Sequence, residues 1–454
     1  MRASSPIAEN PVVLALPVTH AFTPQRVNSL LSNVSWMLSA NIVQVAVQLG
    51  MLLALTRCSD LATVGRFAYA SAVVNPVILL AQMQLRNLQV VDISRRFSFR
   101  DYLSFRATSV CAAMLILVAI SCMHSHDLAA IILALSVVRV TDSISDMFQG
   151  ALQQAEQFRA LGISTMLRNI LSGIGFIGAI VCFQDLNAAV LTLASVSLAI
   201  TIGLDIPLWF AVLPRSGAPG WPLSRSFLSP NFSKIAVTAF PLGCATFLSA
   251  VEGNLPRYFL AISASEEAIG IFSTIVACAN LGAILINAIA QSVGPQLARL
   301  LKGGEIHAFR RFVGTLVLCG FGIGFVGFLG ALFMGKQALT LVFGNYEPRY
   351  LSLLLVILAG VALCYTHIFI GTGLMAANLY SVKSRLQLIS VCSCAVLLVL
   401  LTPSFQIFGA AISLLGTSAI MVFLHAAVFL KYIQSELAAK RCEIQPQPNL
   451  KMSA

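Results

Sequence analysis

Long apolar segments recur along the whole chain, and they constrain its fold more than any other feature. One of them, IGIFSTIVACANLGAILINAIA (residues 269–290), contains no charged residue. Segments of about 20 such residues are long enough to cross a bilayer core of about 30 Å as a helix. The runs are continuous and lack the two-residue alternation of barrel strands, so we expect helices. Only 10% of the 454 residues are charged, against about 25% in soluble domains, which excludes a soluble fold.

The apolar segments predict an all-α integral membrane protein with twelve transmembrane helices in two six-helix lobes. The longest polar connection is rich in Pro, Gly and Ser and separates the sixth segment from the seventh. We therefore expect a cytoplasmic N-terminal tail, a first lobe, a cytoplasmic linker, a second lobe and a cytoplasmic C-terminal tail, at residues 1–32, 33–213, 214–233, 234–432 and 433–454.

Basic residues indicate the orientation of these helices. With the N-terminus in the cytoplasm, most of the 28 Lys and Arg residues fall in cytoplasmic loops and tails. This is the bias that the positive-inside rule describes, and it places both termini in the cytoplasm. The net charge of +11 needs no nucleic-acid partner, because the basic residues are spread over loops that face anionic headgroups.

A weak internal repeat relates the two halves. Shifted by 205 residues, Gly65 falls on Gly270 and Asn75 falls on Asn280, within segments that share a Gly-x-Phe opening. We favour a duplication over chance coincidence. Since each half has six spans, the two halves would enter the membrane in the same orientation, related by an axis along the membrane normal.

Amide side chains form stripes on two of the predicted helices. Asn41, Gln44 and Gln48 are spaced i, i+3 and i+7, so they share one helix face. A comparable stripe follows the eighth span, with Asn280, Asn287 and Gln291. Such stripes indicate the wall of a polar cavity, with an interhelical hydrogen bond as the alternative.

Charged residues within the spans indicate further candidate sites. The fourth span carries Arg139, Asp142 and Asp146 on one stripe, which lines a cavity or forms a self-neutralised pair that locks two helices. The seventh span carries Glu252 and Arg257, which are too far apart around a helix to pair with each other. Glu252 is either a proton-binding group or half of a structural pair, and Arg257 either faces the cavity or extends to the outer interface.

Three stretches carry a resemblance to a known family. They are the Gly-x-Phe opening that leads to QLRNLQVVD (Gln84–Asp92), the stretch DSISDMFQGALQQAEQFRALG (Asp142–Gly162), and EGNLPRYFL with GIFS (Glu252–Leu260, Gly270–Ser273). The sequence resembles the polysaccharide transporter (Wzx-type oligosaccharide flippase) family of the MOP superfamily. The resemblance implies two lobes around a central cavity, alternating access, and a substrate that consists of an oligosaccharide on undecaprenyl pyrophosphate.

The resemblance also implies site roles, partners and a location. Arg139 and Arg257 would attract the anionic carrier, the amide stripes would contact sugar hydroxyls, and Glu252, Asp142 or Asp146 would couple transport to a proton or sodium gradient. No cofactor is expected. The partners would be membrane lipids, a polysaccharide polymerase and glycosyltransferases, and the location the bacterial inner membrane.

Two other functions stay open at this point. A MATE-like exporter of cationic drugs would need a cavity dominated by carboxylates, whereas arginine accompanies the carboxylates in this sequence. A membrane polymerase or ligase would need a large outer loop and a catalytic constellation, and the predicted outer loops are short. The 11 cysteines show no metal-binding or redox spacing, so we interpret them as small packing residues.

Overall fold

The computed structural model describes residues 24–92, 96–212, 231–345 and 347–444, and its regular elements within these ranges are all helices. Most of the predicted linker and the outer parts of both predicted tails lie outside the described residues. Eleven of the described helical segments are long and apolar enough to cross a membrane. These helices confirm the predicted class, an all-helical membrane protein.

The helices of the first half are α1 (Pro24–Cys58), α2 (Leu61–Gln82), α3 (Leu85–Val91), α4 (Phe99–Ser121), α5 (His126–Gln154), α6 (Phe158–Phe183), α7 (Leu186–Ile200) and α8 (Ile206–Val212), and a π-helical segment, η1 (Thr201–Asp205), joins α7 to α8. Those of the second half are α9 (Phe232–Ser263), α10 (Glu266–Ala279), α11 (Ala283–Lys302), α12 (Ile306–Phe343), α13 (Pro348–Ala376) and α14 (Tyr380–Ile444), and a 3₁₀ turn, η3 (Asn280–Gly282), joins α10 to α11. Helix therefore extends into both predicted tails, since α1 begins at Pro24 and α14 ends at Ile444.

Short polar side chains cap the helices between the apolar runs. Asp60 accepts a hydrogen bond from the Thr63 N–H at the start of α2, at 3.0 Å. Ser98 and Asp101 form a reciprocal capping box at the start of α4. These bonds satisfy backbone donors that the first helical turn leaves without partners, and they set where each span begins.

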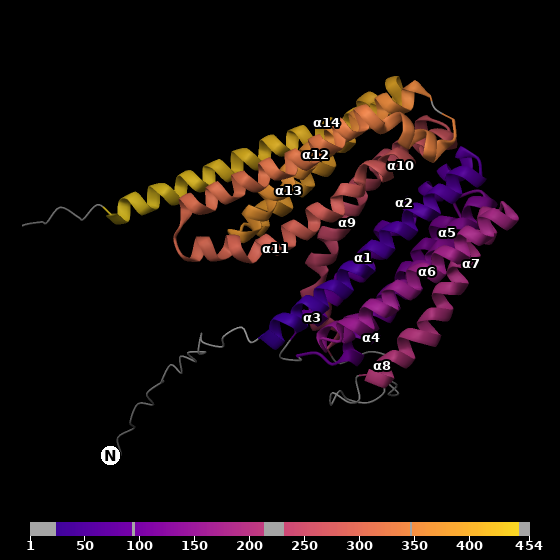
Figure 1. Ribbon diagram of the computed structural model, residues 1–454, viewed down its shortest axis with the longest axis horizontal. Coiled ribbons are helices and arrows are strands. Elements are labelled where there is room, and N and C mark those ends of the chain that lie inside the picture. Colours follow the sequence, from indigo (N-terminus) through magenta and orange to yellow (C-terminus); the bar gives the residue numbers. More distant parts are fainter. Residues whose placement is uncertain (1–23, 93–95, 213–230, 346, 445–454) are drawn as a thin grey trace, which may run out of the picture.

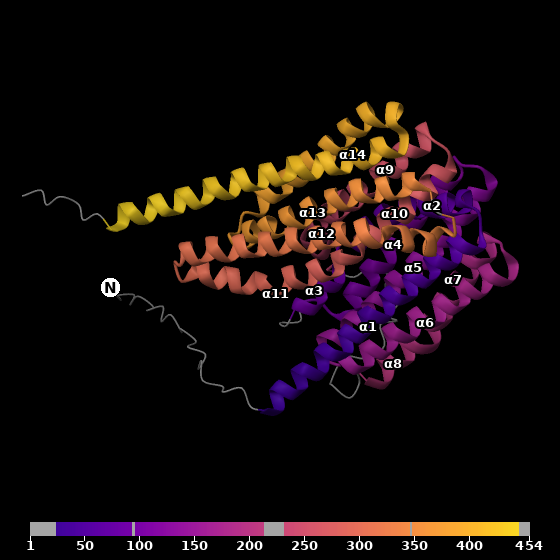
Figure 2. The ribbon, with the colours of Figure 1, turned by 45° about the horizontal axis from the view of Figure 1, so that its top comes forward.

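The long helix α14 contains a break. Gln406 has a backbone conformation outside the helical region, with φ 47° and ψ −118°, three residues after Pro403. A Cβ placed on Gly416 would lie 3.0 Å from the Leu397 side chain, which a straight helix would hold far away. The two parts of α14 therefore run back along each other, and Figure 2 shows the gold chain turning at the upper right before the yellow part returns.

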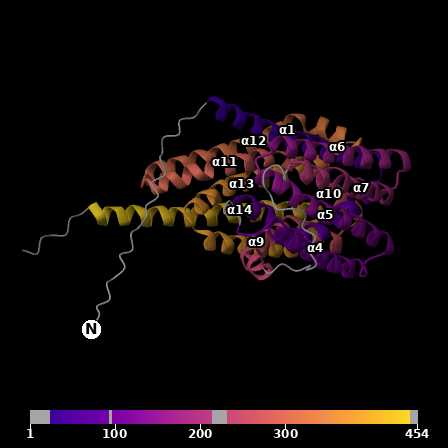
Figure 3. The ribbon, with the colours of Figure 1, turned by 90° about the horizontal axis from the view of Figure 1, so that it is seen from below.

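The helices form two groups that converge at one end and diverge at the other (Figure 1). One buried apolar cluster comes entirely from α1–α7, and two others come from α9–α14. The diverging end carries the first turns of α1 and the last turns of α14, which project beyond the other helices in the view from below (Figure 3).

Hydrogen bonds join α1 to α12 at the converging end. The Arg57 guanidinium donates to the backbone oxygens of Leu341 and Thr340, at 2.8 and 3.1 Å, in the last turn of α12. The Thr56 hydroxyl donates to the Val342 oxygen at 3.0 Å. The C-terminal end of α1 is thus tied to the C-terminal end of α12.

Candidate functional site

A cavity of about 470 Å³, the polar cavity, lies between the two groups of helices, and polar side chains interrupt its mostly apolar wall. Its wall combines residues from α1, α2, α5 and α6 of the first half with residues from α10 and η3 of the second half. The polar lining includes Gln48, Ser71, Arg139 and Asn280. This volume falls within the range of about 300–1,000 Å³ that is usual for ligand pockets.

Arg139 is the cation of this cavity. Its side chain is 45% exposed, and its nearest carboxylate is Asp142, one turn along α5, with an N–O separation of 3.8 Å. That distance makes the pair a loose one, because a charge-assisted hydrogen bond is about 2.7–2.9 Å long. The guanidinium keeps donors that can meet an anion in the cavity.

The structure brings one residue of each amide stripe to this cavity. Gln48 from α1 and Asn280 from η3 lie in its wall together with Arg139. Asn41 and Asn287 are exposed and Gln44 is partly buried, and these three lie outside the cavity wall. The side chain of Gln291 lies outside the described residues. An amide can donate to and accept from a hydroxyl, so Gln48 and Asn280 suit a sugar.

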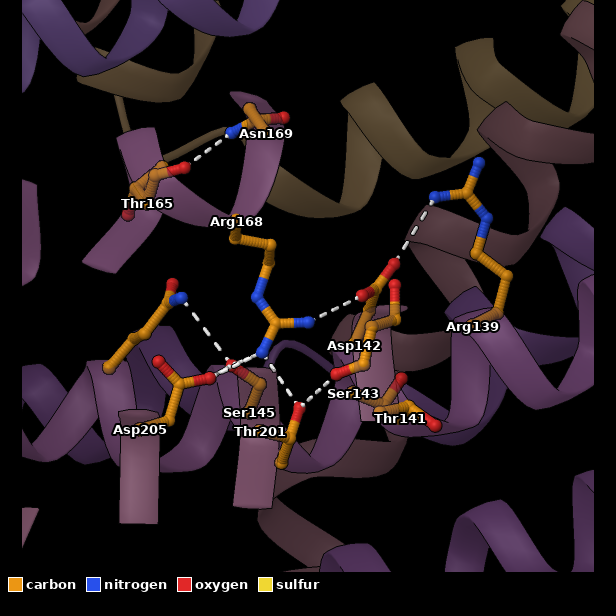
Figure 4. Close-up of polar contacts among 12 residues, drawn as sticks. Arg139, Thr141, Asp142, Ser143, Ser145, Thr165, Arg168, Asn169, Thr201 and Asp205 are labelled. Carbon is orange, nitrogen blue, oxygen red and sulfur yellow. Dashed lines mark hydrogen bonds and ion pairs between the residues drawn. The ribbon is translucent and has the colours of Figure 1, made fainter. Parts of the chain in front are cut away.

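Arg168 of α6 is the centre of a buried polar network (Figure 4). It donates to Asp142 at 2.9 Å and to the hydroxyls of Ser145 and Thr201 at 2.7 Å each. It also forms an ion pair with Asp205, whose side chain is 1% exposed. Arg168 therefore lies inside the first group of helices and does not extend to the membrane interface.

The π-helical segment η1 shapes this network. Its wider turn presents Thr201 and Asp205, its first and last residues, to the same guanidinium. Isolated π-turns within α-helical segments are found often at functional sites. Two arginines, Arg168 and Arg139, face the two carboxylates of Asp142 and Asp205, so the four groups together carry no net charge and do not make the cavity acidic.

Asp146 belongs to a second cluster, nearer to the start of α3. It pairs with Arg86 at 2.9 Å and with Arg106 at 3.6 Å. Arg106 is fully buried, although its place beside the expected start of the third span indicates a loop-facing residue. Arg86 also donates to Gln153 at 3.0 Å, so the cluster joins α3, α4 and α5.

Glu252 and Arg257 of α9 face different neighbours, as their spacing predicts. Glu252 accepts hydrogen bonds from Gln387 and Ser390 of α14. Arg257 donates to Ser273 of α10 at 2.9 Å and to Asn254 at 2.7 Å. Arg257 is not part of the wall of the polar cavity. Its hydrogen bond to Ser273 instead joins α9 to α10.

Sequence reasoning missed the partners of Glu252. Lys383, Gln387 and Ser390 are spaced i, i+4 and i+7 on the first part of α14, so a polar stripe is present in the sequence there as well. The sequence also provided no indication that Arg86 and Arg106 pair with Asp146, because their positions suggest loop residues. Their burial within the first helix group follows from helix packing, which the sequence does not show.

The geometry supports binding of an anionic, hydroxyl-bearing ligand. The cavity offers one loosely paired guanidinium, two amides and the Ser71 hydroxyl. Within the described residues, no group of three or more His, Cys, Asp or Glu side chains could hold a metal ion.

Comparisons with known proteins agree with this geometry. The family model described as polysaccharide biosynthesis protein matches residues 30–301, more than half of the chain. The chain is 26% identical to the capsular polysaccharide biosynthesis protein CapF of Staphylococcus aureus over 394 residues, which cover 85% of this chain and 95% of that protein.

Solved structures show the same fold. The inward-facing conformation of a multidrug resistance MATE transporter of the MOP superfamily superimposes with a TM-score of 0.68 at 11% identity, over 87% of this chain and 96% of that one. The lipid II flippase MurJ in an inward closed conformation gives a TM-score of 0.65 at 10% identity, over 91% and 94% of the two chains. The chain belongs to the polysaccharide biosynthesis protein family and has the multi-pass helical fold of MOP-superfamily transporters.

Proposed function

We propose that this protein flips a lipid-linked oligosaccharide, carried on undecaprenyl pyrophosphate, from the cytoplasmic to the outer leaflet of the bacterial inner membrane. The observation that carries the proposal is the cavity between the two helix groups, where Arg139 meets the amides of Gln48 and Asn280. The product would enter O-antigen, capsule or exopolysaccharide synthesis. Polymerases and glycosyltransferases would act before and after this step.

Arg139 would bind the pyrophosphate. A doubly anionic group that leaves water for a low-dielectric cavity needs a fixed cation, and a planar guanidinium can donate two parallel hydrogen bonds to it. The loose 3.8 Å contact with Asp142 would give way at little cost. The tight pairs of Arg168 would stay in place, because breaking them leaves buried charges unpaired.

The transport cycle would alternate access to this cavity. The hydrogen bonds from Arg57 and Thr56 to α12 would close the outer side while the helix groups diverge toward the cytoplasm. The similarity to an inward-facing MATE transporter supports this assignment of sides. Twelve crossings, with the break at Gln406 as a turn between the last two, would place both termini in the cytoplasm.

Expression of the gene in a strain that lacks its own flippase for a matching surface glycan tests the proposal. The wild type should restore surface polysaccharide. Arg139→Gln should lower the amount at least about tenfold at equal protein level, the usual loss for an anion contact of about 1.5–3 kcal/mol. Arg349→Gln is the matched control, because Arg349 is 60% exposed, pairs with Glu347 and lies outside the cavity wall.

The alternative function, a MATE-like exporter of cationic drugs, makes the opposite prediction. If the protein is such an exporter, its expression should make the host less susceptible to these drugs and should leave the surface polysaccharide unchanged. The cavity counts against it, since Arg139 lines the wall and the neighbouring carboxylates are paired with arginines. An enzymatic role in the same pathway would need a covalent change in the glycan, which mass spectrometry of the lipid-linked product detects.

A further inference from the structure

A second cavity, of about 440 Å³, lies directly beside the polar one. It is bounded by α1, by α10 with η3, and by the facing sides of α12 and α13, and its lining is almost entirely apolar. Leu49, Leu52 and Leu281 line both cavities. The two cavities therefore adjoin along these three leucines, one with a polar part beside Arg139 and the other almost entirely apolar.

Glycines of α12 keep the groove open. A Cβ on Gly330 would meet no atom within 4 Å, and one on Gly327 would meet its first atom at 3.9 Å. Gly324 and Gly335 differ, because a Cβ there would press on Ala362 and Leu351 of α13. Two glycines thus allow α12 to pack closely on α13, whereas the other two leave space that larger side chains would fill.

Tyr365 gives an independent indication of a ligand. Its side chain lines the groove and is 3% exposed, and its hydroxyl has no hydrogen-bond partner among the described residues. A Cβ on Gly282 would lie 2.9 Å from that oxygen, so the hydroxyl points at the η3 turn where the two cavities adjoin. The oxygen itself is buried against η3, so a ligand in the groove reaches it only when this turn shifts, and the new contact would then relieve the cost of about 1–3 kcal/mol of an unpartnered buried hydroxyl.

We propose that this groove binds the isoprenoid chain of the lipid carrier, at the isoprene units next to the pyrophosphate. The inference rests on the proposed function and names the subsite that the tail occupies. The residues that line α12 extend from Ile323 to Val342, roughly 28 Å along the helix axis at about 1.5 Å per residue. A groove that extends so far along α12 suits an extended hydrocarbon chain.

The chemistry favours an isoprenoid over a saturated acyl chain. Each isoprene unit contains a carbon–carbon double bond, and a π-system is the one acceptor that a hydrocarbon offers to the Tyr365 hydroxyl. The methyl branch of each unit fits the gaps that Gly327 and Gly330 leave. Arg139 in the adjoining cavity supplies the charge that a prenyl diphosphate head requires.

Photolabelling in nanodiscs tests the groove. The probe is farnesyl diphosphate with a diazirine on its terminal isoprene unit. Adducts should map to helices that line the groove, above all to the peptide from Ile323 to Val342 of α12, and undecaprenyl phosphate should compete with the probe more strongly than dipalmitoyl phosphatidic acid, whose acyl chains are saturated. Gly330→Leu should lower labelling of this peptide at least about fivefold, because the new side chain removes the space for an isoprene unit.

Gly322→Leu is the matched control. It lies on the same helix, a Cβ there would meet no neighbour within 4 Å, and it lines neither cavity, so labelling should stay at the wild-type level. Adducts on helices that do not line the groove, or equal labelling of the two leucine variants, would overturn the proposal. Equal competition by phosphatidic acid would overturn the isoprenoid assignment and identify a general lipid groove.

A surface-polysaccharide assay on the same strains separates the two proposals. If the wild type restores the polysaccharide while the adducts lie outside the groove, the proposed binding of the isoprenoid chain in this groove is wrong. The proposed flippase function then stands. If the wild type neither restores polysaccharide nor binds the probe, the proposed function itself fails.

Discussion

Gly65 of α2 and Gly270 of α10 lie against each other where the two helix groups converge. A Cβ on Gly270 would come to 3.0 Å from the Gly65 amide nitrogen, and one on Gly65 to 3.2 Å from the Gly270 nitrogen. These residues occupy equivalent positions under the 205-residue shift that relates the two halves of the sequence. Equivalent residues of a duplicated chain touch only close to the axis that relates the two copies, so the contact agrees with the predicted duplication.

Gly65→Ala should force α2 and α10 apart. The added methyl group clashes with the backbone oxygen of Glu266, which cannot move without displacing α10. Overpacking of this kind costs about 1–3 kcal/mol, so the midpoint of thermal unfolding in detergent should fall. Gly178→Ala on α6 is the control, since its Cβ meets nothing within 4 Å. An equal or higher midpoint for Gly65→Ala would contradict the close crossing.

Arg57→Gln should weaken closure of the converging end. It removes two charge-assisted hydrogen bonds to the carbonyls of Leu341 and Thr340, at the negative end of the α12 dipole. A loss of about 1–2 kcal/mol shifts a two-state equilibrium roughly tenfold toward separation of the groups. Pulsed electron paramagnetic resonance between spin labels at the exposed positions Asp127 and Asn345 should show a larger population at long distance.

Arg349→Gln provides the comparison for the Arg57 measurement. Arg349 is an exposed arginine on the first turn of α13, and its ion-pair partner is its neighbour Glu347. The distance distribution should therefore stay as in the wild type. Identical distributions for Arg57→Gln and the wild type would show that α1 and α12 are held together by other contacts.

Arg168→Met should strongly destabilise the protein. The substitution leaves Asp142 and Asp205 without their shared cation, and Asp205 is 1% exposed. Breaking a buried ion pair by removing one partner costs about 3–5 kcal/mol. Adding Asp205→Asn should recover part of the loss, because no unpaired carboxylate then stays beside Ser145 and Ser164. Simple additivity of the two effects in thermal unfolding would argue against a coupled network.

Glu252→Gln should abolish the coupling of transport to an ion gradient and leave folding unchanged. The Glu252 carboxylate forms no ion pair among the described residues and is held by Gln387 and Ser390. A neutral amide of the same shape should therefore keep the fold and abolish the dependence of flipping on an imposed proton or sodium gradient in proteoliposomes. Asp146→Asn should do the reverse, losing stability while keeping gradient dependence, because Asp146 neutralises Arg86 and Arg106. Gradient dependence that survives Glu252→Gln would move the coupling site elsewhere.

The helical class could be predicted from local pattern. A bilayer leaves no partner for exposed backbone groups, so each apolar run of about 20 residues has one low-energy choice, a helix, and the runs can be recognised without knowledge of their neighbours. The spacing of Glu252 and Arg257 likewise excludes their pairing, because the angle around a helix is a local property. The repeat relates Gly65 to Gly270, but their contact follows only from the way α2 and α10 pack.

The composition of the site depended on tertiary structure. Gln48, Arg139 and Asn280 come from three helices, and Asn41 and Gln44 share the helix face of Gln48 without lining the cavity. Hydrogen bonds and ion pairs act over a few ångströms, so polar groups distributed over several helices find their partners only once those helices are packed. The sequence by itself thus determined which segments are long and apolar enough to cross a membrane and which of their faces are polar, and helix packing decided which of those polar faces meet.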